Sequence, residues 1–469
     1  REVTETALVR TILLTAGFPL GGEAAPAPPT AADPATEPAI LDTLGVDLTR
    51  AARAGRLGPV IGRDAEIERV IETLCRRTKR NPALLGPAGV GKTAIIEGLA
   101  QRVAAGAVPA PLRDARIVLL SAAAIVAGCR LVGEVEGRML ALLREASAAD
   151  VILFFDEAHT LVGAGAGGRG GGDLANIVKP ALARGEVACI AATTDEEYRL
   201  YIEGDAALER RFQPIRVQEL TPEATLSALA AVRDSLARAQ GVTVPEAQLA
   251  WIVSFAGQYL RNRHFPDKAI DILEQCAARG VADGKTTLAQ ADVETVARRM
   301  VGMPQDLGQR LIALRAALTA QGLLPPETID ALLKRLAVTL RGFDLRAARP
   351  NAVLLLLGAA AAQSEPLAAT IADGLYGDAA RVVTLDWARF ARESDLTMLF
   401  GSPPGYVGYQ GRLPLHQVQQ MPWCVLRCEN VQAAHPAALE ALTQALHEGY
   451  LTLADGKRVF FSDAIVLLA

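Results

Sequence analysis

One short stretch constrains the fold of this chain more than any other: residues 86–93 read GPAGVGKT. The stretch follows an apolar run at residues 83–85 and precedes a helical pattern at residues 94–103. A GxxxxGK(S/T) sequence between a strand and a helix is typical of a loop that binds phosphates. Its glycines let backbone N–H groups turn inward around the phosphates, and the helix N-terminus adds partial positive charge. The sequence therefore predicts an α/β fold with a nucleotide site at this loop.

All eight residues of this loop are candidate nucleotide-binding residues: Gly86, Pro87, Ala88, Gly89, Val90, Gly91, Lys92 and Thr93. Lys92 is expected to neutralise the outer phosphates of the nucleotide, and Thr93 to offer its hydroxyl to Mg²⁺. The predicted cofactors are therefore ATP and Mg²⁺.

A pair of carboxylates follows another apolar run, because Asp156 and Glu157 come directly after residues 151–155. Beside a phosphate loop, Asp156 is expected to hold the metal directly or through water, and Glu157 to orient and polarise the attacking water. Two carboxylates at the end of a strand can also be ordinary solvated turn residues. The apolar run before the pair favours the catalytic interpretation.

Two further groups of polar residues are candidates for the same site. A predicted strand at residues 189–194 ends in two threonines, of which Thr194 is a candidate catalytic residue near the γ-phosphate. Arg210 and Arg211 end a helix-like segment. A guanidinium delivered to the transition state accelerates phosphoryl transfer about 10³–10⁵-fold. The arginine pair could also be an exposed charged face, although the catalytic interpretation is favoured, chiefly because of the resemblance given below. As catalytic groups, the arginines would act on a neighbouring subunit, which implies a ring.

The order of apolar runs divides the 469 residues into modules. Apolar runs of strand length alternate with helical patterns up to residue 212, which is typical of a parallel sheet with covering helices. Strands are then predicted to cease, and helical periodicity dominates to about residue 301. A second alternation has runs at residues 352–357, 381–385, 424–426 and 464–468. The predicted units are an N-terminal helical remnant (1–20), a Pro/Ala-rich linker (21–44), a large α/β domain (45–215), a helical lid (216–303), a helical connector (304–345) and a second α/β domain (346–469).

Composition excludes several classes of protein. The 48 Lys and Arg residues against 52 Asp and Glu give a net charge of −4, without the basic excess typical of nucleic-acid-binding proteins. No apolar run approaches the roughly 20 residues that a membrane-spanning helix needs. The six cysteines form no CxxC pair, which indicates a reduced, cytoplasmic protein. Cys424 and Cys428 could form a redox couple, although burial as small apolar side chains is favoured.

Several further motifs occur in a fixed order around the phosphate loop, and together they carry a family resemblance: VIGRDAEIERVI (60–71), RTKRNPALLGPAGVGKTAIIEGLA (77–100), FFDEAHTLVGAG (154–165), KPALARGE (179–186), AATTDEEYRLYIEGDAALERRFQ (191–213) and FPDKAIDILEQ (265–275). From about residue 45 to 303, the chain resembles the first ATPase module of the Clp-type AAA+ unfoldases and chaperones (ClpA, ClpB, ClpC and ClpV). The resemblance implies tandem P-loop AAA+ modules, each a parallel sheet flanked by helices, with a small helical lid after the first.

The resemblance also implies roles for individual residues. Thr194 would be the nucleotide sensor, and Arg210 with Arg211 would be fingers acting in trans. Val60 and Ile61 would line the adenine pocket. The family further implies a homo-oligomeric ring, expected to be a hexamer, that acts on a protein substrate or a dedicated protein partner, with no nucleic acid and no membrane insertion.

The second module resembles the second ATPase module of the same family only in part, because its phosphate loop has lost the required residues. The chain reads GAAAAQSE at residues 358–365, so that Ser364 and Glu365 stand in place of lysine and threonine. Glu365 would bring a carboxylate towards a polyphosphate, which is repulsive. The counterpart of the carboxylate pair is Glu429-Asn430, and an asparagine cannot act as a carboxylate base. This module is predicted to be a non-hydrolysing pseudo-ATPase.

Two loops correspond to the substrate-gripping pore loops of the family. GSPPGYVGY (401–409) places Tyr406 in the gripping position. In the first module the position falls within GCRLVGE (128–134), on Leu131 next to Arg130, so that an aromatic ring is replaced by an aliphatic side chain.

Two functions remain open from the sequence. The leading hypothesis is an ATP-driven protein-remodelling motor powered by the first module. The alternative is a nucleotide-gated scaffold or assembly factor without threading activity, which the losses in the second module and Leu131 would suit. A nucleic-acid-handling AAA+ ATPase is disfavoured by the balanced charge and the few aromatic residues.

Overall fold

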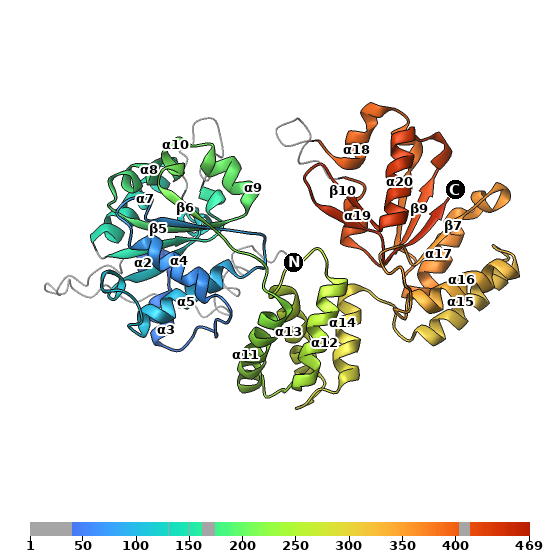
Figure 1. The fold of residues 1–469 in the computed structure, drawn as a ribbon, viewed down its shortest axis with the longest axis horizontal. Helices are drawn as coiled ribbons and strands as arrows, with labels where there is room; N and C mark the ends of the chain where they lie inside the picture. The colour runs from blue at the N-terminus through green and yellow to red at the C-terminus, as the bar shows by residue number, and fades with distance from the viewer. Residues whose placement is uncertain (1–39, 130, 149, 162–173, 403–412) are drawn as a thin grey trace, which may run out of the picture.

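The computed structural model describes residues 40–129, 131–148, 150–161, 174–402 and 413–469. Two α/β modules lie on either side of a helical domain, so that the first module, the helical domain and the second module follow one another in space as in sequence (Figure 1). The expected tandem arrangement is therefore present.

The first module is a parallel sheet with helices on both faces. Its elements are α2 (Ile40–Leu44), β1 (Val46–Asp47), α3 (Leu48–Arg53), α4 (Asp64–Leu74), β2 (Asn81–Leu85), α5 (Lys92–Ala104), η1 (Ala110–Leu112), β3 (Arg116–Leu120), α6 (Ala122–Val126), α7 (Val132–Ala148), β4 (Val151–Phe155), η2 (Ala158–Leu161), α8 (Leu174–Arg184), β5 (Ala188–Thr193), α9 (Asp195–Tyr198), η3 (Arg199–Glu203), α10 (Ala206–Glu209) and β6 (Phe212–Arg216).

The strand order of this sheet is β1-β3-β4-β5-β2-β6, with every pair parallel except β1 and β3. All five residues of β2 and of β4 are buried, because helices cover both faces of the sheet. Side chains alternate between two cores, one against α7 and α8 and the other against α4 and α5. Because β2, β4 and β5 are parallel neighbours, the segments that follow them meet at one edge of the sheet.

The structure corrects the sequence prediction at both ends of this module. Strands do not cease at residue 212, because β6 pairs in parallel with β2 along its whole length. The predicted linker does not extend to residue 44, because α2 packs on α7 with Leu41 buried. The backbone N–H of Leu41 also donates a hydrogen bond of 3.2 Å to Glu145.

Four helices form the lid: α11 (Pro222–Gln240), α12 (Glu246–Tyr259), α13 (Asp267–Ala282) and α14 (Gln290–Val301). Their apolar faces share one core, in which Leu249, Ile252 and Ile272 are fully buried. Trp423 from the second module belongs to the same core and is 3% exposed. The lid of the first module is therefore packed directly against the second module.

The rest of the described chain forms the connector and the second module: α15 (Leu307–Gln321), α16 (Pro326–Thr339), β7 (Ala352–Leu355), η4 (Gly358–Gln363), α17 (Ser364–Tyr376), β8 (Val382–Asp386), η5 (Trp387–Phe390), η6 (Glu393–Asp395), α18 (Leu396–Phe400), α19 (His416–Gln420), β9 (Val425–Glu429), η7 (Val431–Ala433), α20 (Pro436–Glu448), β10 (Tyr450–Thr452), β11 (Arg458–Phe460) and β12 (Ile465–Leu468).

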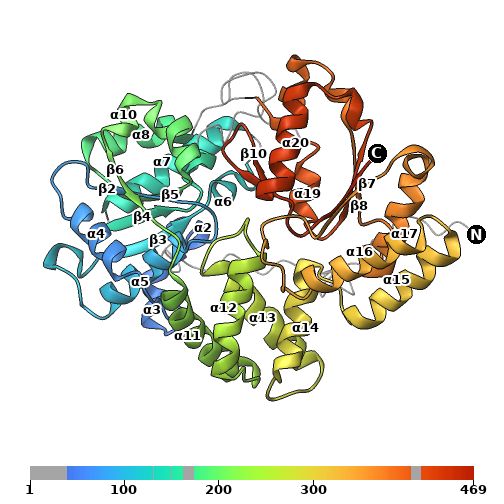
Figure 2. The same ribbon diagram turned by 45° about the vertical axis from the view of Figure 1, so that its right-hand side comes forward.

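The second sheet repeats the strand order of the first. Its strands run β7-β12-β9-β8, all parallel, and they match β2-β5-β4-β3. The connector helices α15 and α16 pack with α17 on one face, while α19 and α20 cover the other (Figure 2). This shared order identifies the residues of the second module that correspond to those of the first.

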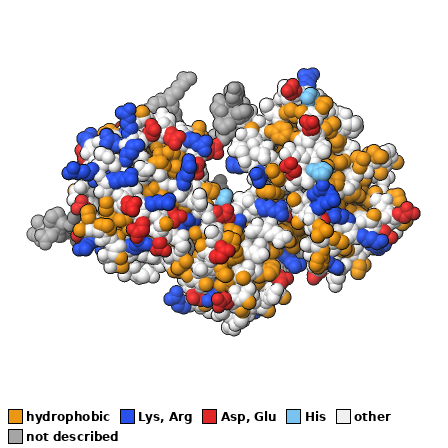
Figure 3. All heavy atoms as spheres, in the orientation of Figure 1, with side chains coloured by type: hydrophobic (Ala, Val, Ile, Leu, Met, Phe, Trp, Pro, Cys, Tyr) orange, Lys and Arg blue, Asp and Glu red, His pale blue; other side chains and the backbone are white. Residues whose placement is uncertain are grey.

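The surface carries charges of both signs. Figure 3 shows basic and acidic side chains interspersed on the visible face of the first module. Among the described residues, no helix is both long enough and apolar enough to cross a membrane.

Candidate nucleotide-binding site

The phosphate loop connects β2 to α5 and depends on its glycines. Gly89 and Gly91 have φ values of 81° and 90°, in the left-handed region that favours glycine. A Cβ at Gly86 would lie 2.5 Å from the carbonyl oxygen of Val217, so a side chain there would clash with backbone. The loop that the motif predicts is therefore present, and Gly89, Gly91 and the first residues of α5 line the cleft.

Lys92 lies at the start of α5 and lines a cleft of about 700 Å³ at the carboxyl edge of the sheet. Its Nζ donates hydrogen bonds of 2.8 and 3.0 Å to the carbonyl oxygens of Gly86 and Pro87. Burial lowers the pKa of Lys92, although nearby carboxylates, chiefly Asp156, oppose the shift. A desolvated ammonium group held in its own loop is suited to an incoming polyanion, which would replace its lost hydration.

Thr93, Asp156 and Glu157 meet at the same edge. The Thr93 hydroxyl donates a hydrogen bond of 2.7 Å to a carboxylate oxygen of Asp156, which follows β4 directly. A hydroxyl and a carboxylate in contact beside a phosphate loop are oxygen ligands of the kind that Mg²⁺ takes. Glu157 has φ 54°, and its exposed side chain lines the cleft next to this pair. The residues present therefore fit a magnesium ion.

Glu197 completes the polar wall beside β5, and sequence analysis missed it. Its carboxylate accepts hydrogen bonds from the Thr193 hydroxyl (2.8 Å) and the Thr194 N–H (3.0 Å), and lies 3.1 Å from His159. Although burial alone would raise the pKa of Glu197, these hydrogen bonds and His159 hold it below the usual value. The Thr194 hydroxyl in turn accepts a hydrogen bond from the Glu197 N–H. Thr194 therefore caps α9 and also lines the cleft.

The lid closes another side of the cleft through the start of α13. The N–H of Asp267 lies 3.4 Å from the Gly89 carbonyl oxygen, and Asp267 lines the cleft. Burial raises the pKa of Asp267. The hinge before the lid is held by Glu219, whose carboxylate accepts from Lys268 at 3.0 Å and from the Phe265 N–H at 2.7 Å. The lid therefore contacts the phosphate loop and is tied to the hinge.

Arg63 joins the loop to the hinge from the N-terminal side. It is 4% exposed, and its guanidinium donates to the carbonyl oxygens of Val90 (2.5 Å) and Gln218 (2.9 Å). It lies within the VIGRD motif, three residues after Val60, but its role as a brace between loop and hinge could not be read from spacing.

Arg210 and Arg211 lie at the opposite edge of the sheet. They precede β6, whose first residue, Phe212, is in register with Asn81 at the start of β2. The phosphate loop follows the other end of β2, about 17 Å away for a strand of five residues. Neither arginine lines the cleft or forms an ion pair within the described part of the chain. They are too distant to serve the site of their own module.

The remaining predicted residues are distributed as follows. Val60 packs over α5, close to Gly98, and Ile61 is 38% exposed; neither borders the cleft around Lys92. Leu131 is 68% exposed in front of α7. Arg130 and Tyr406 lie outside the described residues.

The corresponding edge of the second module is built differently. Residues 358–363 form the 3-10 helix η4, and the positions of Gly89 and Gly91 hold Ala361 and Gln363. The turn after the strand is retained: Asn430 has φ 53°, and its carbonyl oxygen accepts the N–H three residues on, as that of Glu157 does. The Asn430 amide donates a hydrogen bond of 2.9 Å to Asp386.

Family models match all three parts of the chain. They are the ATPase family associated with various cellular activities (AAA) at residues 83–219, the AAA lid domain at residues 221–310, and the AAA domain (Cdc48 subfamily) at residues 349–469. Chaperone protein ClpB of Oceanobacillus iheyensis is 34% identical over 91% of this chain and 61% of its own length. ClpC, the ATP-binding subunit of the ATP-dependent Clp protease of Staphylococcus aureus, is 34% identical over 91% of this chain and 60% of its own.

Solved structures agree with the sequence relatives. Hsp104 in its closed state with ATPγS and FITC casein has a TM-score of 0.77 at 33% identity, covering 92% of this chain and 75% of that one. The extended S. cerevisiae Hsp104:casein complex has a TM-score of 0.76 at 33% identity, with the same coverage. This chain belongs to the Clp-type AAA+ ATPases. It spans about three-fifths of the length of the curated relatives that it matches.

Family membership confirms the predicted tandem AAA+ fold with its lid. The motifs of a Clp-type module could be recognised in the sequence because they follow the strands directly. His159, Glu197 and Asp267 were missed because they reach the cleft through turns and the lid, and no local pattern marks them.

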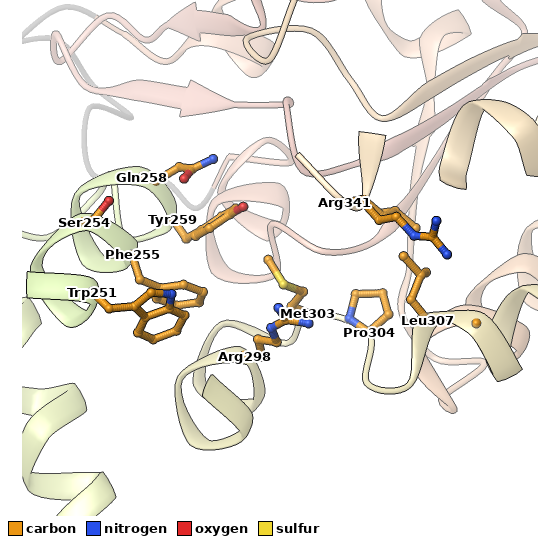
Figure 4. A pocket seen from close by; sticks show the side chains of 12 residues that line it. Trp251, Ser254, Phe255, Gln258, Tyr259, Arg298, Met303, Pro304, Leu307 and Arg341 are labelled. Atoms are coloured by element: carbon orange, nitrogen blue, oxygen red, sulfur yellow. The ribbon is translucent and has the colours of Figure 1, made fainter. Parts of the chain in front are cut away.

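A second hollow of this Clp-type chain, of about 420 Å³, lies away from the phosphate loop, between the lid and the connector. The rings of Trp251, Phe255 and Tyr259 project from α12 towards it, opposite Arg298 and Arg341 (Figure 4). The Phe255 ring contacts both of the others, with centroids 4.8 Å from that of Trp251 and 4.7 Å from that of Tyr259. The hollow lacks a glycine-rich loop, so it is a junction between units and not a phosphate site.

Proposed function

We propose that this chain is the motor part of an ATP-driven protein-remodelling machine of the Clp type, in which the first module hydrolyses ATP and the second does not. One observation carries the proposal. Lys92, the Thr93–Asp156 pair and Glu157 meet in the cleft of the first module, whereas Ser364, Glu365, Glu429 and Asn430 occupy the equivalent positions of the second.

The chemistry of the first module follows from these positions. Lys92 and the loop N–H groups bind and neutralise the phosphates. Thr93 and Asp156 hold the magnesium ion, which supplies Lewis acidity at the phosphates when bound. Glu157 orients and polarises the attacking water, and Thr194 senses the γ-phosphate. Val60 and Ile61 contact the adenine as the lid closes around it.

The second module lacks the groups that serve these roles in the first. Its loop is wound into η4, so that Ala361 and Gln363 do not provide the left-handed turns of Gly89 and Gly91. Its side chains place no ammonium group at the loop and no carboxylate at Asn430. Together these features support a module that retains the fold for assembly or substrate contact without hydrolysis.

The position of Arg210 and Arg211 supports assembly into a homo-oligomeric ring, for which we propose a hexamer. The guanidinium groups of Arg210, which is exposed, and Arg211, which is half-buried, lie at the far edge of the sheet and cannot serve their own cleft, but they can complete that of a neighbour. The structures similar to this chain include Hsp104 complexes with casein, which supports a protein as the substrate. In this proposal, Arg130 and Leu131 of the first module and Tyr406 of the second module hold the substrate.

The direct test compares turnover in three variants of the full chain. Glu157→Gln is expected to bind ATP and to lower hydrolysis by about 10²–10⁴-fold, because the general base is lost. Ser364→Ala and Asn430→Ala are expected to hydrolyse ATP at close to the wild-type rate. Near-normal turnover in Glu157→Gln, or a large loss in either second-module variant, would contradict the proposal.

Leu131 favours one alternative, a nucleotide-gated scaffold without threading activity, because an exposed aliphatic side chain replaces the aromatic ring expected of a gripping loop. The two functions differ in one measurement. A motor unfolds a tagged, stably folded substrate when ATP is present, whereas a scaffold changes its oligomeric state without unfolding the substrate.

A further inference from the structure

Strand β9 of the second module carries an arginine where the first module has a buried aromatic ring. Counting back three residues from Asn430 and from Glu157, which share the same turn, Arg427 corresponds to Phe154. Phe154 is fully buried against the α5 face of its sheet. Arg427 lies on the matching face, and its side chain is only 11% exposed.

The guanidinium of Arg427 reaches the two carboxylates that replace the metal-binding pair. Its Nη1 lies 3.2 Å from Glu429, at the position of Asp156, and 3.5 Å from Glu365, at the position of Thr93. Its Nε donates to the Thr384 hydroxyl of β8 at 3.3 Å. A single cationic group therefore stands between the two positions that would flank a magnesium ion.

We propose that Arg427 is a built-in cation of the second module, which takes the place of the metal ion and closes this site to a metal–nucleotide complex. The inference rests on the proposed function, because it explains how a module without nucleotide chemistry keeps this edge of its sheet ordered. The guanidinium supplies permanently the positive charge that the first module obtains from Lys92 and a bound metal.

The chemistry of the site explains why a metal does not fit. A divalent cation needs carboxylate oxygens at about 2.0–2.6 Å, and it cannot share the position with a guanidinium because like charges repel strongly when partly desolvated. Arg427 also lowers the repulsion between the carboxylate of Glu429 and that of Glu365, whose side chain is 81% exposed. Removing the Arg427 side chain should therefore leave two carboxylates that can bind another cation.

Manganese binding without nucleotide tests this directly. In the full chain, Asp156→Asn first removes the metal ligand of the first module, so that this background is expected to bind no Mn²⁺. Adding Arg427→Met is expected to create one Mn²⁺ site per chain, and adding Glu429→Gln as well should weaken it by about tenfold or more. Arg427→Lys, which keeps the charge, is the matched control and should bind no Mn²⁺. A folded methionine variant that takes up no Mn²⁺ would overturn the inference.

A thermodynamic cycle keeps the test decisive if Arg427→Met folds poorly. The thermal midpoints of wild type, Arg427→Met, Glu429→Gln and the double variant should be non-additive, with the double variant losing less than the sum of the single losses. Additive losses would contradict a paired cation. Failure of the proposed function has a separate signature: near-normal ATP turnover in Glu157→Gln would show that hydrolysis does not depend on the first module, and it would leave the Mn²⁺ result for Arg427→Met unaffected.

Discussion

Glu157 and Asn430 have nearly the same backbone conformation, with φ values of 54° and 53°, at matching ends of β4 and β9. This left-handed region is unfavourable for most side chains and is tolerated better by asparagine. The second module thus holds the residue that suits the turn, while the first keeps a glutamate at a conformational cost. Strain retained at such a position is typical of a residue kept for its chemistry.

Replacing Glu157 with asparagine should therefore separate stability from activity. We expect Glu157→Asn to raise the unfolding free energy of the first module by on the order of 0.5–1 kcal/mol, because the strain is relieved, and to abolish hydrolysis. Glu157→Gln is the matched control, since it removes the charge and leaves the backbone preference almost unchanged. Urea unfolding without nucleotide compares the two; equal midpoints would contradict the assigned strain.

The residues that could be predicted from sequence are those fixed by local pattern. Lys92 and Thr93 belong to a contiguous loop, and Asp156 follows an apolar strand directly. Glu197 could not be predicted, because its place depends on the capping of α9 and on strand β5. Arg427 could not be predicted either, because its partner Glu365 lies 62 residues earlier in the chain and no local pattern joins the two.

At the scale of elements, α5 is tightly covered at its middle. A Cβ at Gly98 would lie 2.6 Å from Ile67 and 3.2 Å from Val60. Val60 belongs to the segment proposed to contact the adenine, so the position of that segment depends on the absence of a side chain at Gly98. Replacing a helix glycine that lacks such neighbours with alanine would instead raise the unfolding free energy.

Two glycine-to-alanine substitutions make this a paired prediction. Gly98→Ala should lower the unfolding free energy by about 1–3 kcal/mol through overpacking, and should weaken nucleotide binding by moving Val60. Gly137→Ala in α7, where a Cβ meets nothing within 4 Å, should raise the unfolding free energy by about 0.5–1 kcal/mol. Urea unfolding and titration with a fluorescent ATP analogue check both substitutions. Unchanged nucleotide affinity in Gly98→Ala would contradict the assignment of Val60 to the adenine pocket.

The elements themselves were predictable where burial is two-sided. The runs that became β4 and β12 are continuously apolar, so they stand out in the sequence. Strand β6 (FQPIR) was missed because it is an edge strand, in which Gln213, Pro214 and Arg216 interrupt the apolar pattern. Its extended conformation comes from pairing with β2, which no local pattern reveals.

At the scale of the whole molecule, the lid and the second module form one packed unit. Tyr259 of the lid lies 6.0 Å from Trp423, ring centroid to ring centroid, and Arg261 donates a hydrogen bond to Ser462. Burial raises the pKa of the adjacent Asp463 to about 6, although Arg261 opposes the shift. A carboxylate buried at this junction makes the contact between the units dependent on pH.

The direction of that dependence follows from the pKa. Because Asp463 has a higher pKa in the folded chain than its ordinary value of about 4, its contribution to stability is greatest below pH 4 and is lost as the pH rises to about 6. At pH 7.5, Asp463→Asn should therefore be more stable than wild type by on the order of 2 kcal/mol, and the difference should vanish near pH 4.

The matched control for this prediction is Asp455→Asn in the same module. Although burial alone would raise the pKa of Asp455, hydrogen bonds and charge from Lys457 hold it below the usual value. Asp455→Asn should consequently lose stability at pH 7.5, the opposite sign. Thermal unfolding of both variants between pH 4 and 8 checks the pair, and a pH-independent difference for Asp463→Asn would contradict the buried charge.

The largest-scale prediction concerns Arg210 and Arg211, which lie across the sheet from the phosphate loop. If each subunit completes the cleft of its neighbour, the two halves of a competent site can come from different defective chains. Arg210→Ala/Arg211→Ala chains keep an intact cleft, and Lys92→Ala chains keep intact arginines. Each alone should lose turnover by about 10³-fold or more. Co-assembled in equal amounts, they should recover activity at about a quarter of the interfaces of a randomly mixed closed ring.

A second mixture decides whether recovery reflects shared sites or mere stabilisation of the ring. Lys92→Ala chains mixed with Glu157→Gln chains also assemble with all arginines present, yet every cleft is defective, so this mixture should remain inactive. Differential tags and co-purification establish that mixed rings form before turnover is measured. Equal activity in the two mixtures, or full turnover by Arg210→Ala/Arg211→Ala chains alone, would show that these arginines do not act between subunits, because only a site divided across the interface can be restored by exchanging one of its halves.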